Sequence, residues 1–307
     1  MLFFPLSYAI LLCGITIGIL LTFVTSSYPA ISLLAIGILL FTGCLRITPI
    51  LSLFHRLVVS LFPDTYTSAV KNLRESFQLQ DIGKHDHTTR GLYVFHPHGV
   101  CSVAMLYHTA THFTDWPTRT ISTTIKHTFY NAPCIPEVTE GIYTPSTYTA
   151  MKKVLEGGKS LAVALGGAEE IIHTRPGAMK LLVTPRKGVF KMALETGTPL
   201  IPVLTYGENE AYSIYRSPFL DSILRLCVEH GIFFFIPTVD SLWQWLGIAS
   251  RPLKTPLRTV LGAAVPVVQQ NATDDKIAAL KATYIAALRS LYAETRPSDY
   301  QEELEIV

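Results

Sequence analysis

The sequence predicts an α/β domain that follows an N-terminal hairpin of two membrane-spanning helices. The segment from Met1 to Leu45 contains no Asp, Glu, Lys or Arg, and 49% of the 307-residue chain is hydrophobic. After residue 90, short β-like runs alternate with segments of helical periodicity, which is typical of an α/β sheet and not of a helical bundle or a β-sandwich. We therefore expect a hairpin over residues 1–48 and one globular domain over residues 49–307.

The hairpin is predicted from two apolar runs. Leu6–Val24 is long enough to cross the ~30 Å hydrocarbon layer of a bilayer, and Ala30–Leu45 approaches that length at ~1.5 Å per residue. Residues 26–29 (Ser-Ser-Tyr-Pro) separate the runs and suit a turn. Arg46 follows the second run directly, and positive charge at the end of a span favours the cytosolic side. The globular domain should then face the cytosol. A cleaved signal peptide is the alternative, opposed by the length of the run and the uncharged start.

Two later segments have compositions that suit membrane contact. Pro49–Tyr66 mixes bulky apolar residues with polar ones, as does a helix lying along a membrane surface, although a core helix would show the same pattern. Gly231–Ile248 is rich in Phe and Trp, which favour either the lipid headgroup zone or a protein core.

Composition and missing motifs exclude several classes of function. The formal net charge is +2 and no block of basic residues occurs, so nucleic acid is not an expected partner. The five cysteines are widely spaced and form no CxxC pair, which argues against a disulfide framework and a zinc site. The sequence contains no GxSxG elbow, no GxxxxGK[ST] loop and no GxGxxG loop, so serine hydrolases and common nucleotide-binding folds are not indicated.

Three predicted strands are each followed directly by an unusual motif. The strands are expected at Leu92–Phe95, Leu161–Leu165 and Leu200–Tyr206. The motifs that follow them are, in the same order, His96–Gly99 (HPHG), Gly166–Glu170 (GGAEE) and Gly207–Glu210 (GENE). Ligands of open α/β sheets bind beyond the carboxyl ends of the strands, so the three motifs are predicted to share one site.

Helices are expected between and after these strands. Ser146 or Thr147 can cap a helix that stops at Gly157-Gly158. A second helix should run from about Arg186 to Thr196 and end at Gly197, and a third, with an apolar stripe, is expected over Asp274–Glu294.

The two histidines of HPHG are the first candidates for chemistry. His96 and His98 would face the same way in an extended segment, and such a pair can move protons or bind a metal. No HExxH motif or Cys/His partner accompanies them, so proton transfer is favoured over zinc. Either histidine could instead be a core residue. Glu169 and Glu170 could orient an imidazole, or they could be solvated charges at a helix start.

A predicted helix start carries two cations. Arg186 and Lys187 follow Pro185, where their charge opposes the helix dipole. This placement is explained if both side chains and the amide of Gly188 hold an anion such as a phosphate. The alternative is a solvent-facing pair.

The motifs as a set resemble the type-2 diacylglycerol acyltransferase family, which includes monoacylglycerol acyltransferases and some wax synthases. Residues 93–99 resemble its HPHG signature, and Gly166–Glu170 resembles its GGAxE motif. Pro176-Gly177, Pro185–Lys191 and Ile201–Glu210 are similar to its PG step, its RKGFVKLAL block and its VPxxxFGENE motif. The likeness spans about residues 50 to 295.

This resemblance implies a membrane enzyme with a glycerolipid-acyltransferase-like mixed sheet flanked by helices. Its substrates would be acyl-CoA and diacylglycerol or a similar neutral lipid, with no cofactor and no metal. It would work at the endoplasmic-reticulum membrane, with a cytosol-facing site, or on lipid droplets. The family's base maps onto His98, supported by His96, and its glutamate maps onto Glu170. The resemblance also places further residues at the substrates: Gly99, Gly166, Gly167, Glu169, Arg186, Lys187, Gly188, Glu208 and Asn209.

The resemblance leaves the acceptor open. The family often carries an arginine in a PVSR-like segment near the acceptor, whereas this sequence has Thr147 there. Esterification of diacylglycerol to triacylglycerol is the expected reaction. The alternatives are a monoacylglycerol, fatty-alcohol or sterol acyltransferase, and a non-catalytic lipid-binding membrane protein.

Overall fold

The computed structural model describes ten stretches of the chain. These are residues 77–81, 90–100, 102–110, 121–125, 143–229, 236, 238, 257–298, 300 and 303–307. The predicted hairpin and the segment 49–66 lie outside the described residues, as does almost all of 231–248. Within the described stretches, no helix combines the length and apolarity needed to cross a membrane.

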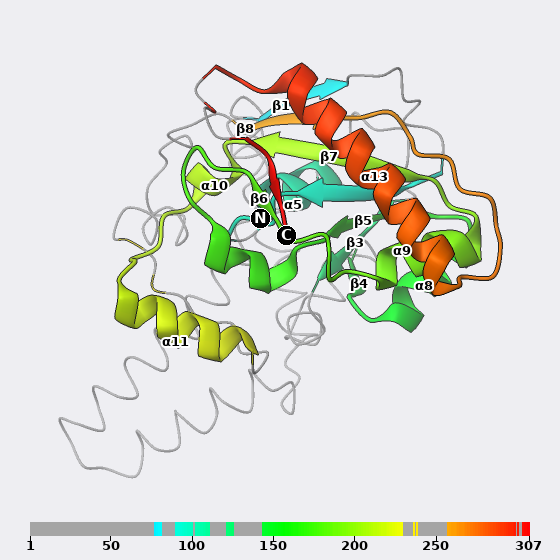
Figure 1. Ribbon diagram of the computed structural model, residues 1–307, viewed down its shortest axis with the longest axis horizontal. Coiled ribbons are helices and arrows are strands. Elements are labelled where there is room, and N and C mark those ends of the chain that lie inside the picture. Colours follow the sequence, from blue (N-terminus) through cyan, green and yellow to red (C-terminus); the bar gives the residue numbers. More distant parts are fainter. Residues whose placement is uncertain are drawn as a thin grey trace, which may run out of the picture.

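A mixed β-sheet forms the centre of the described domain (Figure 1). Seven strands are arranged in the order β1-β8-β7-β2-β5-β3-β4. Their bounds are β1 Phe77–Asp81, β2 Leu92–His96, β3 Ile121–Ile125, β4 Tyr143–Pro145, β5 Ser160–Ala164, β7 Leu200–Tyr206 and β8 Leu257–Leu261. Strands β7 and β8 pair antiparallel, and the other neighbours pair parallel. The central strands β2 and β7 are buried along their whole length, as their near-continuous apolar sequences require.

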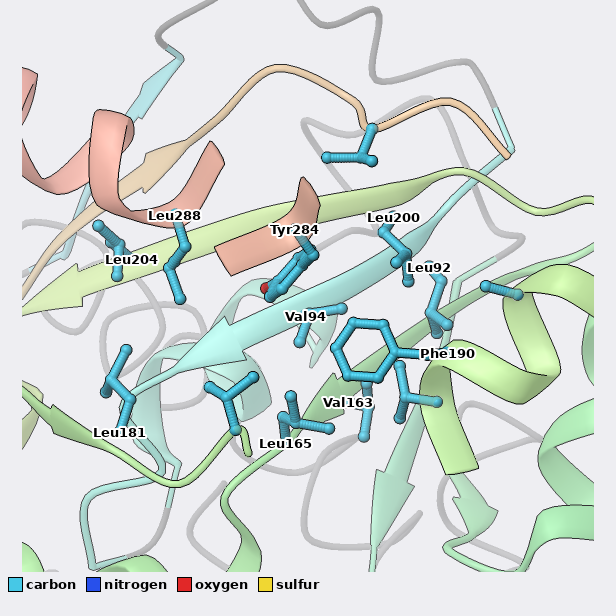
Figure 2. Close-up of a cluster of buried hydrophobic side chains, with 14 of the residues drawn as sticks. Leu92, Val94, Val163, Leu165, Leu181, Phe190, Leu200, Leu204, Tyr284 and Leu288 are labelled. Carbon is cyan, nitrogen blue, oxygen red and sulfur yellow. The ribbon is translucent and has the colours of Figure 1, made fainter. Parts of the chain in front are cut away.

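Helices cover both faces of this sheet. The helices α8 (Tyr148–Glu156), α9 (Gly188–Thr196) and α13 (Asp274–Thr295) share one core with it, and α5 (Val103–Ala110) packs on the other face. Figure 2 shows the larger core, where Tyr284 of α13 lies between Val94 and Leu288, and Phe190 of α9 lies beside Val94. Successive residues of β2 alternate between the two cores, because side chains in a strand point to opposite faces.

Short elements surround the carboxyl ends of the central strands. A 3₁₀ helix, η1 (Gly167–His173), follows β5, and the one-turn helix α10 (Glu208–Ala211) follows β7. The helix α11 (Pro218–Glu229) comes next in the chain, and β6 (Lys180–Leu181) pairs in parallel with β9 (Glu305–Ile306).

The expected elements within the described residues are confirmed with small shifts. The helix α8 begins after Thr147 and ends at Gly157, and α9 ends at Gly197, whose φ of 62° is the left-handed conformation that glycine adopts without strain. The helix α13 extends one residue beyond the prediction. The strand β2 is also one residue longer than predicted, so His96 belongs to the strand and His98 lies beyond it.

Candidate active site

The three strand-end motifs meet at one edge of the sheet. The strands β7, β2 and β5 are neighbours and run parallel, so their carboxyl ends point the same way. HPHG follows β2, GGAEE follows β5 and GENE follows β7. Direct contacts join them, because Glu170 bonds to His98 and Glu208 packs against Gly99.

The carboxylate of Glu170 holds the main chain of the HPHG motif. Its side chain is buried, and Oε2 accepts the backbone N–H of His98 at 2.5 Å while Oε1 accepts that of Leu182 at 2.8 Å. Burial raises the pKa of Glu170 to about 7, although both hydrogen bonds favour the ionised form. The sequence suggested that this carboxylate orients the imidazole, whereas in the structure it contacts the backbone of the same histidine.

Close packing around this carboxylate explains the first glycine of GGAEE. A Cβ on Gly166 would lie 2.3 Å from both Cδ and Oε2 of Glu170. The φ of Gly166 is −63°, which every residue adopts, so the requirement for glycine here is one of space. The place of Gly166 in the site is therefore beside the carboxylate, and a direct contact with substrate stays a prediction.

The imidazole of His98 is half-buried and has a defined tautomer. Its Nδ1 lies 2.9 Å from the carbonyl oxygen of Gly99. Because a carbonyl only accepts hydrogen bonds, Nδ1 carries the proton and Nε2 carries the free lone pair. Burial lowers the pKa of His98, the bond to Gly99 opposes that shift, and the charge of Arg186 adds to it. The ring is therefore neutral at pH 7 and able to accept a proton at Nε2.

The imidazole of His96 lies in the core. It has no exposed surface, and its Nε2 lies 2.9 Å from the hydroxyl of Tyr284 on α13. Burial lowers the pKa of His96 to about 3, so this ring is neutral as well. In the described part of the chain, no three His, Cys, Asp or Glu side chains come together as metal ligands would.

The GENE motif is buried among backbone groups of neighbouring loops. Glu208 is 2% exposed, and its Oε1 and Oε2 accept the N–H groups of Val103 at 2.7 Å and Ala104 at 2.9 Å. Asn209 is also buried, and its Nδ2 donates to the carbonyl oxygen of Ala178 at 2.8 Å. The substrate-binding role expected of this Glu and Asn stays a prediction, and their contacts are with the protein itself.

The two cations at the start of α9 differ in their surroundings. Arg186 turns toward GGAEE, where its Nη2 donates to the carbonyl oxygen of Gly166 at 2.6 Å and pairs with Glu169 at 2.9 Å. Lys187 is 66% exposed and lies 3.3 Å from the exposed Asp274. Gly188 is the first residue of α9, and a Cβ added there would meet no heavy atom within 4 Å from other parts of the described chain. Arg186 is thus engaged with GGAEE, whereas Lys187 is exposed, and an anion site formed by Arg186, Lys187 and the amide of Gly188 stays a prediction.

Comparison with known proteins decides the family. The diacylglycerol acyltransferase family profile matches residues 64–305, which is most of the chain. The chain belongs to the diacylglycerol acyltransferase family. It is 29% identical over 253 residues to the human protein named diacylglycerol O-acyltransferase 2-like protein 6, with 72% of this chain and 71% of that protein covered. It is 27% identical to diacylglycerol O-acyltransferase 2A of Umbelopsis ramanniana, with 72% and 67% covered.

A further relative carries a different name. Bovine 2-acylglycerol O-acyltransferase 1 is 30% identical over 220 residues, with 66% of this chain and 64% of that protein covered. A solved 1-acyl-sn-glycerophosphate acyltransferase from Thermotoga maritima covers 82% of this chain and 98% of its own, at 13% identity and a TM-score of 0.43, which is too low to support an inference. The family assignment makes the chain an acyltransferase that acts on neutral glycerolipids.

Two buried tyrosines that contact the strand-end motifs could not be identified from the sequence. Tyr284 belongs to the helix for which the sequence predicted only an apolar stripe, yet its hydroxyl lies 2.9 Å from Nε2 of His96. Tyr300 is buried, accepts the N–H of Gly207 at 2.9 Å and donates to Glu210 at 3.0 Å. Aromatic residues with a polar tip usually bury the ring and find a partner for the hydroxyl, but the sequence does not show which partner.

Proposed function

We propose that this protein transfers the acyl group of acyl-CoA to the free hydroxyl of diacylglycerol, forming triacylglycerol, with His98 as the general base. The observation that carries the proposal is the state of the His98 ring, which is neutral, half-buried and bonded through Nδ1, with no partner for Nε2 among the described residues. The family assignment supports the acyl-CoA and glycerolipid substrates.

The reaction needs one proton to move twice. Nε2 of His98 takes the proton of the acceptor hydroxyl as its oxygen attacks the thioester carbonyl carbon. The C–O bond forms, the carbonyl oxygen becomes an oxyanion, and the C–S bond then breaks. The departing thiolate of coenzyme A takes the proton back from the imidazolium, which restores the neutral ring. General-base catalysis of this kind typically contributes ~10²–10⁴-fold to the rate.

The residues around this histidine supply placement and charge. Glu170 fixes the main chain of His98, and the guanidinium of Arg186 stands close enough to lower the pKa of the imidazole. The same positive charge would stabilise an oxyanion formed beside the ring. Lys187 and the amides at the start of α9 would take a phosphate of coenzyme A, because a helix N-terminus with an adjacent exposed cation favours an anion.

Monoacylglycerol is the second candidate acceptor. The relative at 30% identity is named a 2-acylglycerol O-acyltransferase, so this acceptor has its own support. Thr147, which replaces the arginine of the family's PVSR-like segment, is exposed and precedes α8. Its side chain makes no capping hydrogen bond to the helix, so the position is open to a lipid headgroup.

An acceptor panel tests the proposed reaction. Full-length protein in washed microsomes would receive labelled oleoyl-CoA with 1,2-diacylglycerol, 2-monoacylglycerol, a long-chain alcohol or a sterol, and the products would be separated by thin-layer chromatography. We expect triacylglycerol to form fastest from diacylglycerol. Faster ester formation with another acceptor would show that this acceptor, and not diacylglycerol, is the preferred substrate. Binding of acyl-CoA without formation of any ester would refute acyl transfer by this site. We also propose that the reaction takes place at the cytosolic face of the endoplasmic-reticulum membrane. The family resemblance implies this membrane, and the uncharged N-terminal run followed by Arg46 favours the cytosolic side.

A further inference from the structure

We infer that Glu208 is a positioning residue for the reaction, one that fixes the location of the His98 imidazole through the turn that carries it. This inference rests on the proposed function, in which His98 is the general base. Glu208 is the first residue of the helix α10, which follows β7, whereas His98 comes from the loop after β2, so the side chain acts between two neighbouring strand ends.

The carboxylate of Glu208 fixes the point where the helix α5 begins. The first N–H groups of a helix have no partner within it and need an acceptor from elsewhere. Glu208 supplies one oxygen to the N–H of Val103 and the other to that of Ala104, at 2.7 and 2.9 Å. A buried carboxylate without such bonds would be costly, so the side chain and the start of α5 hold each other in place.

The same side chain presses against the turn that precedes α5. A Cβ on Gly99 would lie 2.8 Å from Cγ of Glu208 and 3.1 Å from its Oε1, and the φ of Gly99 is +56°. The main chain at Gly99 therefore runs directly along Glu208, in a conformation that favours glycine. The carbonyl of this glycine is the acceptor for Nδ1 of His98, so its position determines how the imidazole is oriented.

Hydrogen bonds within the turn transmit this constraint to the histidine. The carbonyl oxygen of His98 accepts the N–H of Ser102 at 2.8 Å and its hydroxyl at 3.1 Å. Ser102 has a φ of 48°, which is uncommon outside glycine and persists only where the surroundings impose it. The turn is thus held at its start by Glu170, on the N–H of His98, and at its end by Glu208, on the N–H of Val103.

These contacts assign Glu208 a role in placement and none in proton transfer. Its two oxygens are engaged with backbone N–H groups and its side chain is 2% exposed, so it does not touch the reacting atoms. Loss of the carboxylate should free the turn while leaving Lys187, on another element, unaffected. A misplacement of about 1 Å in a reacting group can cost ~10²-fold in rate.

The test compares Glu208→Ala and Glu208→Gln in full-length, detergent-purified enzyme. We expect Glu208→Ala to lower kcat by about 10- to 100-fold, with the KM for acyl-CoA changed by less than about threefold. In the pH dependence of kcat, the acidic limb, where activity falls as His98 becomes protonated, should move to lower pH in Glu208→Ala, because the bond to Gly99 that raises the pKa of His98 is weakened. Glu208→Gln keeps one acceptor oxygen and the size of the side chain, so its kcat should lie between those of wild type and Glu208→Ala. This variant also provides the test if Glu208→Ala does not fold.

A matched control separates this role from general destabilisation. Glu210 lies on the same helix and also binds a backbone N–H, but its partners are Gly177 at 2.6 Å and Tyr300 at 3.0 Å, away from the HPHG turn. Glu210→Gln should not shift the acidic limb. In a His98→Ala background, Glu208→Ala should lower the residual rate no further.

The outcomes distinguish this inference from the proposed function. Full activity in His98→Ala would refute the proposed function itself, in which His98 is the general base. If His98→Ala is inactive while Glu208→Ala keeps kcat, or loses kcat without any shift of the acidic limb, the positioning role is wrong and the base assignment stands.

Discussion

Replacing Gly166 by alanine tests the packing at the centre of the site. The new Cβ would lie 2.3 Å from Cδ of Glu170, whereas carbon atoms in contact are normally about 3.5 Å apart, so the carboxylate must retreat by roughly 1 Å. That movement breaks or stretches its bonds to the N–H groups of His98 and Leu182. Each N–H left without a partner in this packed site costs up to about 1–3 kcal/mol, so the loss of both bonds should destabilise the fold of Gly166→Ala by up to about 2–6 kcal/mol.

The displaced carboxylate should also misplace the base. A shift of about 1 Å in His98 should lower kcat by ~10²-fold. Acyl transfer from labelled acyl-CoA and thermal unfolding of the purified protein measure the two effects.

A double-mutant cycle with Glu170→Ala decides the cause. If the clash with Glu170 is responsible, Gly166→Ala should cost little in the Glu170→Ala background, because the alanine leaves room for the new methyl group. Fully additive losses would refute this reasoning.

Three further predictions concern pH, coenzyme A and the core. Because the pKa of Glu170 is raised from 4.5 to about 7 in the folded protein, the folded wild type binds more protons than its unfolded chain between these pH values, and its stability falls as the pH rises. The unfolding free energy of Glu170→Gln minus that of wild type should therefore rise by ~1.4 kcal/mol per pH unit from pH 4.5 to 7 and level off above pH 7. Denaturant titrations at several pH values measure this difference, and a difference that does not change with pH would contradict the raised pKa. Lys187→Ala should raise the KM for acyl-CoA with kcat little changed, whereas Arg186→Ala, which removes the hydrogen bond to the Gly166 carbonyl, should lower kcat as well. Initial-rate kinetics measure KM and kcat for both variants, and an unchanged KM in Lys187→Ala would mean that this lysine does not bind coenzyme A. Tyr284→Phe should destabilise the fold by about 1–3 kcal/mol in thermal unfolding, because the buried Nε2 of His96 loses its partner, and an unchanged melting temperature would mean that this bond contributes nothing.

The sequence was sufficient to predict three of the strands and the motif that follows each of them. Leu92–Phe95, Leu161–Leu165 and Leu200–Tyr206 are short apolar runs that end in glycine-rich or histidine-containing motifs, and such runs form buried parallel strands. Because the carboxyl ends of parallel strands lie along one edge, the meeting of HPHG and GGAEE followed from the same pattern. The helix ends at Gly157 and Gly197 followed from the preference of glycine for C-terminal caps.

The partners of individual side chains could not be predicted in this way. His96 and His98 were expected to face the same way, a rule that holds inside a strand, but β2 ends at His96 and the next two residues lie beyond it. The hydroxyl of Tyr284 reaches His96 from a helix 188 residues further along the chain. Glu170 contacts the backbone of His98 because Gly166 lets the 3₁₀ turn approach closely, and only the packed structure shows that distance.

The activity of His98→Ala tests the central claim most directly. The ring is half-buried and its hydrogen bond is to the carbonyl oxygen of the next residue, so its removal should leave the fold and the melting temperature close to those of wild type. We expect kcat for triacylglycerol formation to fall by ~10²-fold or more, with acyl-CoA binding retained. A folded His98→Ala enzyme that makes triacylglycerol at the wild-type rate would contradict the assignment of this imidazole as the base.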